Sequence, residues 1–256
     1  MQDLRKGFDA DPAGYETGRP GYPDKLFTDL LAYAGLNPGG RALEIGIGTG
    51  QATLPLLQAG LRVDAVELGP KLAAFSRQKF ARWPAFYLHA GDFMELDLPA
   101  QAFDLAFSAS AFHWLPKGRA YGRLRYLLKP GGTAALFWAH SALGPGQELL
   151  AQELARVYAS LGFPFSPAAP DFPRRMERKA NGLRKRGFKG VQAHYYEQSR
   201  QLDADGYIAL LRSSAHHHGL GPDERLRLET IIRGVLEIYG NKVLIRDRYD
   251  LYLGRS

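Results

Sequence analysis

The sequence predicts an α/β fold built on a mostly parallel sheet with helices on both faces. The first observation is that short apolar runs alternate with stretches of helical periodicity between residues 41 and 139, which is typical of consecutive βαβ units. The second is that Gly, Pro or Asp residues bound these runs, as they commonly bound strands and helices. The chain of 256 residues is long enough for one large core.

The predicted strands and helices follow one another in a regular order. Strands are expected at 42–45, 62–68, 85–89, 103–108 and 133–138. Helices are expected at 24–34, 51–59, 70–83 and 117–128. Beyond residue 138 the rhythm changes to a long helix at 146–161, a Pro-rich loop at 164–173 and a basic helix at 174–189. Strands at 191–198 and 243–253, with helices at 203–213 and 222–239, are expected to complete the sheet.

Composition excludes several classes of chemistry. The chain has no Cys, so a disulfide framework, a thiolate zinc site and a cysteine nucleophile are ruled out. No run approaches about 18 apolar residues, and the first residues lack the apolar core of a signal peptide, so we expect no membrane association and a cytoplasmic location. The net charge of +7 arises in the basic segment 174–189, which holds eight Lys and Arg residues and one acid.

The most informative motif is the segment ALEIGIGTGQ at 42–51, an apolar strand that enters a Gly-rich turn and then a helix. Glycine allows the backbone to turn sharply and allows a ligand to lie against the main chain beside a helix N-terminus. The second strand ends in Glu67, where an acid can accept hydrogen bonds from both ribose hydroxyls of an adenosine. After the third strand, Asp92 and Phe93 supply an acid for an adenine amino group and an aromatic ring to pack on the base.

Two classes of cofactor use such a turn. A dinucleotide-binding turn requires Gly-x-Gly-x-x-Gly, whereas Gln51 stands at the sixth position here. Glu44 at the strand end would repel a pyrophosphate and suits a cationic group, such as the ammonium of an amino-acid tail. An NAD-type oxidoreductase therefore remains only as an alternative interpretation.

This combination, together with the LKPGG segment at 128–132, resembles the class I S-adenosylmethionine-dependent methyltransferases. The segments 15–23 and 107–114 are similar to those of small-molecule members, namely trans-aconitate methyltransferase-like and methyltransferase type 11 proteins. The resemblance implies a Rossmann-like, seven-stranded sheet with a helical insertion or lid, S-adenosylmethionine as the cofactor and S-adenosylhomocysteine as the product. It also implies O- or carboxyl methylation of a small molecule by a monomer or homodimer.

Carried over by position, the resemblance assigns cofactor contacts along the chain. The glycines and Glu44 would surround the methionine part, and the N-terminal Tyr15 and Arg19 would fold over the cofactor. The full set of expected cofactor-binding residues is Tyr15, Arg19, Glu44, Gly46, Gly48, Gly50, Glu67, Leu68, Asp92, Phe93, Ser108 and Ala109.

His113 and Trp114 are the candidates for a direct part in catalysis. They follow the fourth strand, at the sheet edge where ligands of open α/β folds bind. A histidine there can take a proton from an acceptor or position it, and an aromatic face can border a sulfonium cation. The alternative is that Trp114 packs in the core and His113 is a hydrogen-bonded structural residue.

Two further segments, at 174–189 and 216–218, raise the questions of nucleic-acid binding and metal binding. Three consecutive histidines at 216–218 cannot point the same way on a helix, so we expect no metal site, although His216 is a candidate for the acceptor pocket. The basic helix at 174–189 raises the alternative of an RNA or protein methyltransferase, but its apolar stripe of Met176, Ala180 and Leu183 favours a packed helix with solvated charges. Nucleic acid is therefore not the expected partner.

The sequence is interpreted as one methyltransferase domain over residues 1–256. Residues 1–40 form an N-terminal cap, 41–140 the cofactor-binding core, 141–189 the helical insertion, and 190–256 complete the sheet and supply acceptor-side helices.

Overall fold

A computed structural model describes residues 4–162, 171–214, 217 and 220–256. The chain divides into two compact units. Unit 1 comprises residues 1–20, 140–171 and 197–248, and unit 2 comprises residues 21–139, 172–196 and 249–256.

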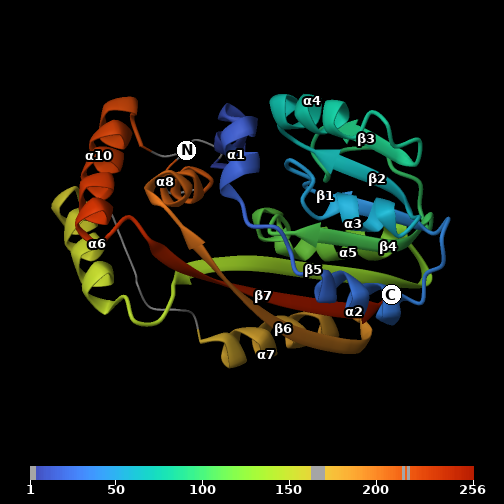
Figure 1. Cartoon of the computed structure of the whole chain (residues 1–256). Helices are drawn as coiled ribbons and strands as arrows, with labels where there is room; N and C mark the ends of the chain where they lie inside the picture. The colour runs from blue at the N-terminus through green and yellow to red at the C-terminus, as the bar shows by residue number, and fades with distance from the viewer. Residues whose placement is uncertain (1–3, 163–170, 215–216, 218–219) are drawn as a thin grey trace. The chain divides into compact units, whose positions relative to one another are not determined.

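Seven strands form one sheet, in the order β3-β2-β1-β4-β5-β7-β6. The strands are β1 (Arg41–Ile45), β2 (Arg62–Glu67), β3 (Phe86–Ala90), β4 (Phe103–Ala109), β5 (Leu128–Leu143), β6 (Lys189–Leu202) and β7 (Val243–Arg255). β1 pairs in parallel with β2 and β4, β2 with β3, and β4 with β5 (Figure 1). The predicted seven-stranded, mostly parallel α/β sheet is confirmed.

The carboxyl ends of the parallel strands in unit 2 meet along one edge of the sheet. The Gly46 N–H donates to the Val66 carbonyl at 2.9 Å, and the Gly91 N–H donates to the Glu67 carbonyl at 2.8 Å. The Ser110 N–H donates to the Phe137 carbonyl at 2.8 Å. The turns that follow β1, β3 and β4 therefore begin at the same edge, which is where open α/β sheets bind ligands.

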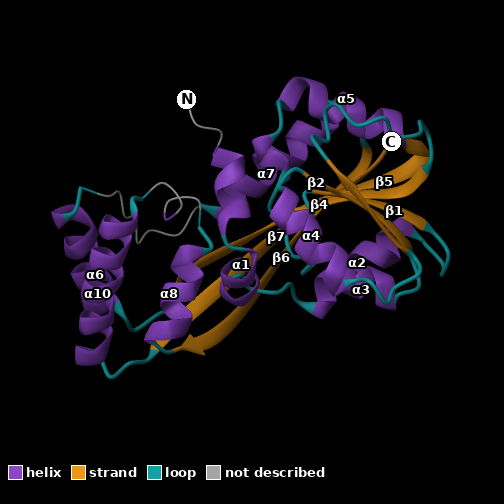
Figure 2. Cartoon of the chain, turned by 90° about the horizontal axis from the view of Figure 1, so that it is seen from above, coloured by secondary structure: helices purple, strands orange, loops and turns teal. Residues whose placement is uncertain are grey.

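Helices cover both faces of the strands in unit 2 (Figure 2). They are α2 (Asp24–Ala34), α3 (Thr53–Gln58), α4 (Pro70–Lys79), α5 (Lys117–Leu127) and α7 (Phe172–Arg184), with a short 3₁₀ turn η2 (Phe112–Trp114) after β4. Local sequence explains their ends. Pro70 starts α4 with a backbone angle suited to a first helical turn, and Gly35 ends α2 in the left-handed region with φ of +63°.

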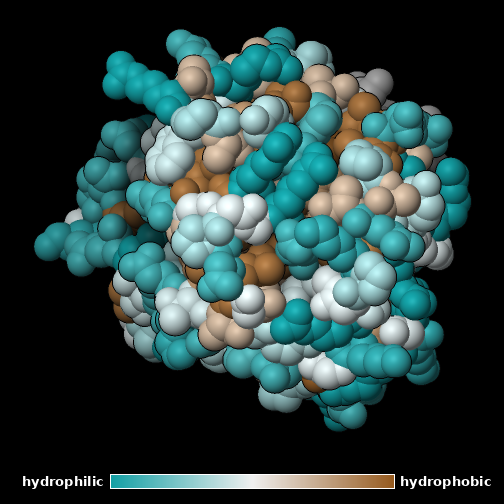
Figure 3. All heavy atoms as spheres, turned by 90° about the vertical axis from the view of Figure 1, so that its right-hand side faces the viewer, coloured by the Kyte–Doolittle hydropathy of each residue, from teal (hydrophilic) through white to brown (hydrophobic). Residues whose placement is uncertain are grey.

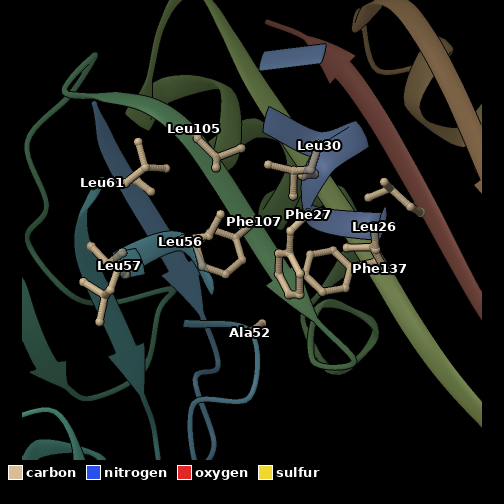
Figure 4. Packing of buried hydrophobic residues seen from close by; sticks show 14 of the residues in the cluster. Leu26, Phe27, Leu30, Ala52, Leu56, Leu57, Leu61, Leu105, Phe107 and Phe137 are labelled. Atoms are coloured by element: carbon tan, nitrogen blue, oxygen red, sulfur yellow. The ribbon is translucent and has the colours of Figure 1, made fainter. Parts of the chain in front are cut away.

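Two apolar clusters hold these layers together. On one face, α2 and α3 pack on the sheet through residues such as Phe27, Leu56, Phe107 and Phe137, which are labelled in Figure 4. On the other face, α5 and α7 pack through residues such as Leu124 and Leu183. Burial of apolar surface contributes about 25 cal/mol per Å² to the stability of the fold. The two clusters therefore hold the strands and helices that carry the sheet edge in fixed positions.

Unit 1 has its own core. It contains η1 (Leu4–Ala10), α1 (Pro12–Gly18), α6 (Glu148–Ser160), α8 (Ala204–Arg212) and α10 (Pro222–Ile238). Leu154, Ile208 and Ile232 are among its buried residues, and α8 begins where the Asp203 carboxylate accepts a hydrogen bond from the Gly206 N–H at 2.8 Å.

Several features differ from the sequence predictions. The basic helix predicted at 174–189 ends at Arg184, and β6 begins at Lys189. The LKPGG segment at 128–132 lies at the start of β5 rather than before it, and β5 continues to Leu143. Helices η1 and α1 were not predicted, because their short apolar content gives no periodic signal. The predicted Pro-rich loop at 164–173 falls mostly outside the described residues.

The surface in Figure 3 is largely hydrophilic, with apolar atoms in small separate patches. Among the described residues, no helix is long and apolar enough to cross a membrane.

Candidate active site

The Gly-rich turn connects β1 to α3. Gly46, Gly48 and Gly50 have φ of +73°, +59° and +82°, in the left-handed region that favours glycine. A Cβ at Gly46 would lie 2.6 Å from the Ala111 Cβ, and one at Gly50 would lie 2.3 Å from the Phe80 ring. The protein's own packing therefore requires glycine at both positions, besides any need of a ligand.

Side chains from β2 and α4 hold the turn in place. The Glu67 carboxylate accepts one hydrogen bond from the Gly48 N–H at 2.8 Å and another from the Gly69 N–H at 2.9 Å. The Ser76 hydroxyl donates to the Gly48 carbonyl at 2.7 Å, and the Lys79 ammonium donates to the Thr49 carbonyl at 2.8 Å. Hydrogen bonds to both the N–H groups and the carbonyl groups of the turn therefore fix its conformation before any ligand binds.

Glu67 lies at the end of β2, as predicted, and is 7% exposed. Each of its carboxylate oxygens accepts one backbone hydrogen bond. A carboxylate held in this way is suited to accept hydrogen bonds from a pair of hydroxyls. Its predicted contact with a ribose stays a prediction.

Glu44 lies at the end of β1 with no exposed surface. The Thr53 hydroxyl donates to Oε2 at 2.5 Å, whereas Oε1 has no hydrogen-bond partner among the described residues. Burial raises the pKa of Glu44 to about 8, and the nearby Glu67 charge adds to this effect, while the Thr53 hydrogen bond opposes it. A buried oxygen without a partner is uncommon in folded proteins, and a polar group such as an ammonium or a water would satisfy it.

The residues after β2 and β3 differ in how much surface they offer. Asp92 is half-buried, and its carboxylate accepts a hydrogen bond from the Met94 N–H at 2.8 Å. Leu68 is also half-buried. Phe93 is only 3% exposed and packs in the core under the Arg123 guanidinium, 5.3 Å from its ring centre. The predicted packing of an adenine on Phe93 is not favoured by this burial and stays a prediction.

The end of β4 contains a strained residue that the sequence did not reveal. Ser108 is buried and its hydroxyl donates to the Ile45 carbonyl at 2.8 Å, while Ala109 is half-buried. Ser110, which follows, has φ of +54° although it is not glycine. Its hydroxyl lies 3.1 Å from the Tyr22 hydroxyl and accepts a hydrogen bond from the Ala139 N–H at 3.2 Å. Backbone strain held by several bonds is typical of functional sites.

His113 and Trp114 lie in η2, directly after this strained residue. His113 is exposed, and its ring centre lies 4.8 Å from that of the half-buried Trp114. The Trp138 indole N–H donates a hydrogen bond to His113 Nδ1 at 3.0 Å. Sequence reasoning did not identify Trp138, because a Trp in a predicted strand is an ordinary core residue.

Tyr15 and Arg19 lie in unit 1, where they contact each other. The Arg19 guanidinium lies 5.1 Å from the centre of the Tyr15 ring, and the Phe8 ring lies 5.9 Å from it. Arg19 Nε is buried without a partner among the described residues. The predicted contacts of Tyr15 and Arg19 with a cofactor stay predictions.

The predicted acceptor-side His216 lies outside the described residues, as does His218. Within the described part of the chain, no group of three His, Cys, Asp or Glu side chains could hold a metal ion.

The basic segment is less solvated than the sequence suggested. Ala180 and Leu183 are buried as predicted. Arg175, however, forms a salt bridge with the buried Asp250 at 2.9 Å. The Lys179 Nζ lies 2.7 Å from the centre of the Trp138 ring, and burial lowers the pKa of Lys179 to about 6. Arg175 therefore uses its charge inside unit 2, and the lowered pKa favours the uncharged form of Lys179 near pH 7.

Known proteins resemble this chain at the same segment. Residues 43–136 match a family model described as a methyltransferase domain. An uncharacterised methyltransferase of Mycobacterium bovis is 33% identical over 137 residues, which is 54% of this chain and 54% of that protein. The chain therefore spans about half the length of the curated relatives that it matches.

Solved structures share the fold over most of the chain. A candidate type II methyltransferase from Anaeromyxobacter dehalogenans has a TM-score of 0.64 at 23% identity and covers 93% of this chain and 97% of its own. A phosphoethanolamine N-methyltransferase of Haemonchus contortus, solved with S-adenosylhomocysteine, has a TM-score of 0.59 at 14% identity and covers 100% of this chain and 60% of its own. Residues 43–136 therefore match a methyltransferase domain, and solved methyltransferase structures share the fold of the chain.

Proposed function

We propose that this protein transfers the methyl group of S-adenosylmethionine to an oxygen of a small-molecule acceptor, by O- or carboxyl methylation, and releases S-adenosylhomocysteine. The observation that carries the proposal is the arrangement of Glu44 and the Gly-rich turn. Glu44 presents a fully buried oxygen without a partner among the described residues, at the strand end that leads into three left-handed glycines.

The residues at the sheet edge fit the groups of this cofactor. Glu44 would take the ammonium of the methionine part, because a buried carboxyl gains a favourable charge partner there. Glu67 would accept hydrogen bonds from the ribose hydroxyls, because a carboxylate oxygen can accept more than one hydrogen bond. Asp92 would face the adenine amino group. Residues 41–140 would hold the cofactor, and the segments before and after them would shape the acceptor pocket.

The chemistry needs little beyond positioning. When bound, the cofactor supplies an electrophilic methyl group on a cationic sulfur. The chain's part is to orient the acceptor oxygen in line with that methyl group and to exclude water, and orientation of this kind can contribute about 7–11 kcal/mol to a reaction barrier. The rigid turn and the strained end of β4 are suited to this task.

A binding experiment separates this proposal from an NAD-type oxidoreductase. In thermal unfolding, S-adenosylhomocysteine at about 100 times its dissociation constant should stabilise the protein by about 2.7 kcal/mol, and NADH should not. A shift of the melting temperature with NADH and none with S-adenosylhomocysteine would overturn the proposal.

Substitution of Glu67 tests the site itself. Glu67→Gln removes a charged acceptor and should weaken S-adenosylhomocysteine binding by about 2–4 kcal/mol in calorimetry, because charge-assisted hydrogen bonds are lost. Glu95→Gln is the matched control, since the Glu95 side chain is 75% exposed in the same unit. Equal dissociation constants for the wild type and Glu67→Gln would remove Glu67 from the site.

A further inference from the structure

We propose that Trp138 holds His113 in the tautomer with its proton on Nε2, so that His113 donates a hydrogen bond to an already ionised acceptor oxygen and does not act as a base. This inference rests on the proposed methyl transfer. It makes Trp138 a positioning residue and favours carboxyl methylation over methylation of a hydroxyl group.

The hydrogen bond between the two side chains determines the tautomer. The Trp138 indole N–H lies 3.0 Å from His113 Nδ1, and an indole nitrogen can only donate. His113 Nδ1 must therefore be the acceptor and carry no proton. In a neutral imidazole the proton is then on Nε2, and an imidazolium would place two donors against each other and lose the bond.

Trp138 itself is closely packed. It is 6% exposed, and its ring centre lies 5.9 Å from that of Tyr252 in an edge-to-face contact. The Lys179 Nζ lies against its ring, with Asp250 as the charged neighbour that most affects Lys179. A ring enclosed on these sides keeps its N–H directed at His113, whereas His113 is exposed at the carboxyl edge of β4.

The two acceptor types differ in their proton balance. Transfer to either oxygen forms an O–C bond and breaks the S–C bond, whose electron pair stays on sulfur. A carboxylate becomes a neutral ester, and no proton is released. A hydroxyl group becomes an ether only if its proton leaves, and a histidine protonated on Nε2 cannot accept that proton through Nε2.

The tautomer can be measured without knowledge of the acceptor. Long-range ¹H–¹⁵N correlation spectra of the histidine-labelled full chain, saturated with S-adenosylhomocysteine, should show His113 with its proton on Nε2. His113→Gln identifies the signal, and Trp138→Phe should return it to a mixture of tautomers. Tyr252→Phe is the matched control, because it alters the same aromatic cluster without touching His113. A proton on Nδ1 in the wild type would overturn the proposal.

Turnover supplies the second test. Paired metabolite acids and the corresponding alcohols or phenols are offered as acceptors, with S-adenosylhomocysteine formation as the readout. For a carboxylate, His113→Gln should retain most of the turnover because its amide keeps an N–H donor, and His113→Ala should lose up to about tenfold. The pH–rate profile should lack an acidic limb near the ordinary histidine pKa.

The opposite pattern identifies a base. If hydroxyl acceptors are preferred, and if His113→Gln and His113→Ala both lose about a hundredfold to ten-thousandfold, His113 accepts a proton and the proposal is wrong. Calorimetry of S-adenosylhomocysteine with each variant separates this result from failure of the proposed function. Loss of cofactor binding by the wild type would contradict methyl transfer itself, whereas normal binding with a base-like profile would contradict only the role of His113.

Discussion

A carboxylic acid without exposed surface is stable only when it keeps its proton or gains a partner, and Glu44 is such a residue. Its pKa of about 8 in the folded protein lies above the ordinary value of 4.5. Between these values the unfolded chain loses the proton and the folded chain keeps it. The free energy of unfolding should therefore fall as the pH rises from about 4.5 to about 8, by at most about 1.4 kcal/mol per pH unit.

Glu44→Gln tests this expectation. The glutamine side chain at position 44 cannot ionise, so the free energy of unfolding of the variant should lack this decline. It should exceed that of the wild type by the largest margin near pH 8. Urea unfolding at several pH values, without cofactor, measures the difference. Glu95→Gln provides the exposed control. Parallel curves for the wild type and Glu44→Gln would show that Glu44 is already ionised in the free protein.

The sequence predicted the position of the site residues better than their environment. Glu44 and Glu67 could be placed at one sheet edge because parallel strands end together. Burial could not be predicted, since it depends on contacts such as that of Glu44 with Thr53 on α3. The strain at Ser110 depends in the same way on Tyr22 and Ala139, which lie far from it in the chain.

At the scale of elements, α7 shows what the apolar periodicity of a helix sequence can and cannot predict. The apolar stripe predicted the buried positions Ala180 and Leu183. Lys179 flanks that stripe, and a flanking lysine normally extends into water. Here the long β5 places Trp138 beside α7, and the lysine packs on it instead. A partner supplied by a distant strand has no signature in the helix sequence.

Lys179→Met should stabilise the protein. The Lys179 Nζ is buried without a hydrogen-bond partner among the described residues, and methionine fills a similar space without the cost of desolvating an amine. The gain should be largest near pH 6 and shrink as the pH rises, because the wild type recovers stability between its folded pKa of about 6 and its ordinary value of 10.5. Thermal unfolding measures it, with the exposed Lys185→Met as control.

The exposed charges of the basic segment test the nucleic-acid alternative. Replacement of Arg178, Lys185 and Lys189 by Gln lowers the net charge from +7 by three units, while the Arg175 salt bridge remains. Turnover of a small-molecule acceptor should stay within about twofold, because exposed charges contribute little to a reaction whose groups they do not contact. Loss of activity together with strongly salt-dependent RNA binding would favour an RNA methyltransferase instead.

At the scale of the whole molecule, Glu44 and Lys179 act in opposite directions on stability. Between pH 6 and pH 8 the first lowers the free energy of unfolding with rising pH and the second raises it. Their contributions should nearly cancel in the wild type over this range. Glu44→Gln should therefore become more stable as the pH rises, and Lys179→Met less stable. If both variants keep the pH dependence of the wild type, then neither Glu44 nor Lys179 has a different pKa in the folded and the unfolded protein.

The strand order has a consequence for how the protein is made. β7 lies between β5 and β6, although it is synthesised after both of them. Until β7 has been synthesised, β5 and β6 each have a strand edge without its partner. Unpaired strand edges can form hydrogen bonds with neighbouring nascent chains and so promote aggregation. A premature stop codon before Val243 would leave both edges permanently open. We therefore expect such truncated products to depend on chaperones and to accumulate as inclusion bodies, even though they retain every residue of the Gly-rich turn.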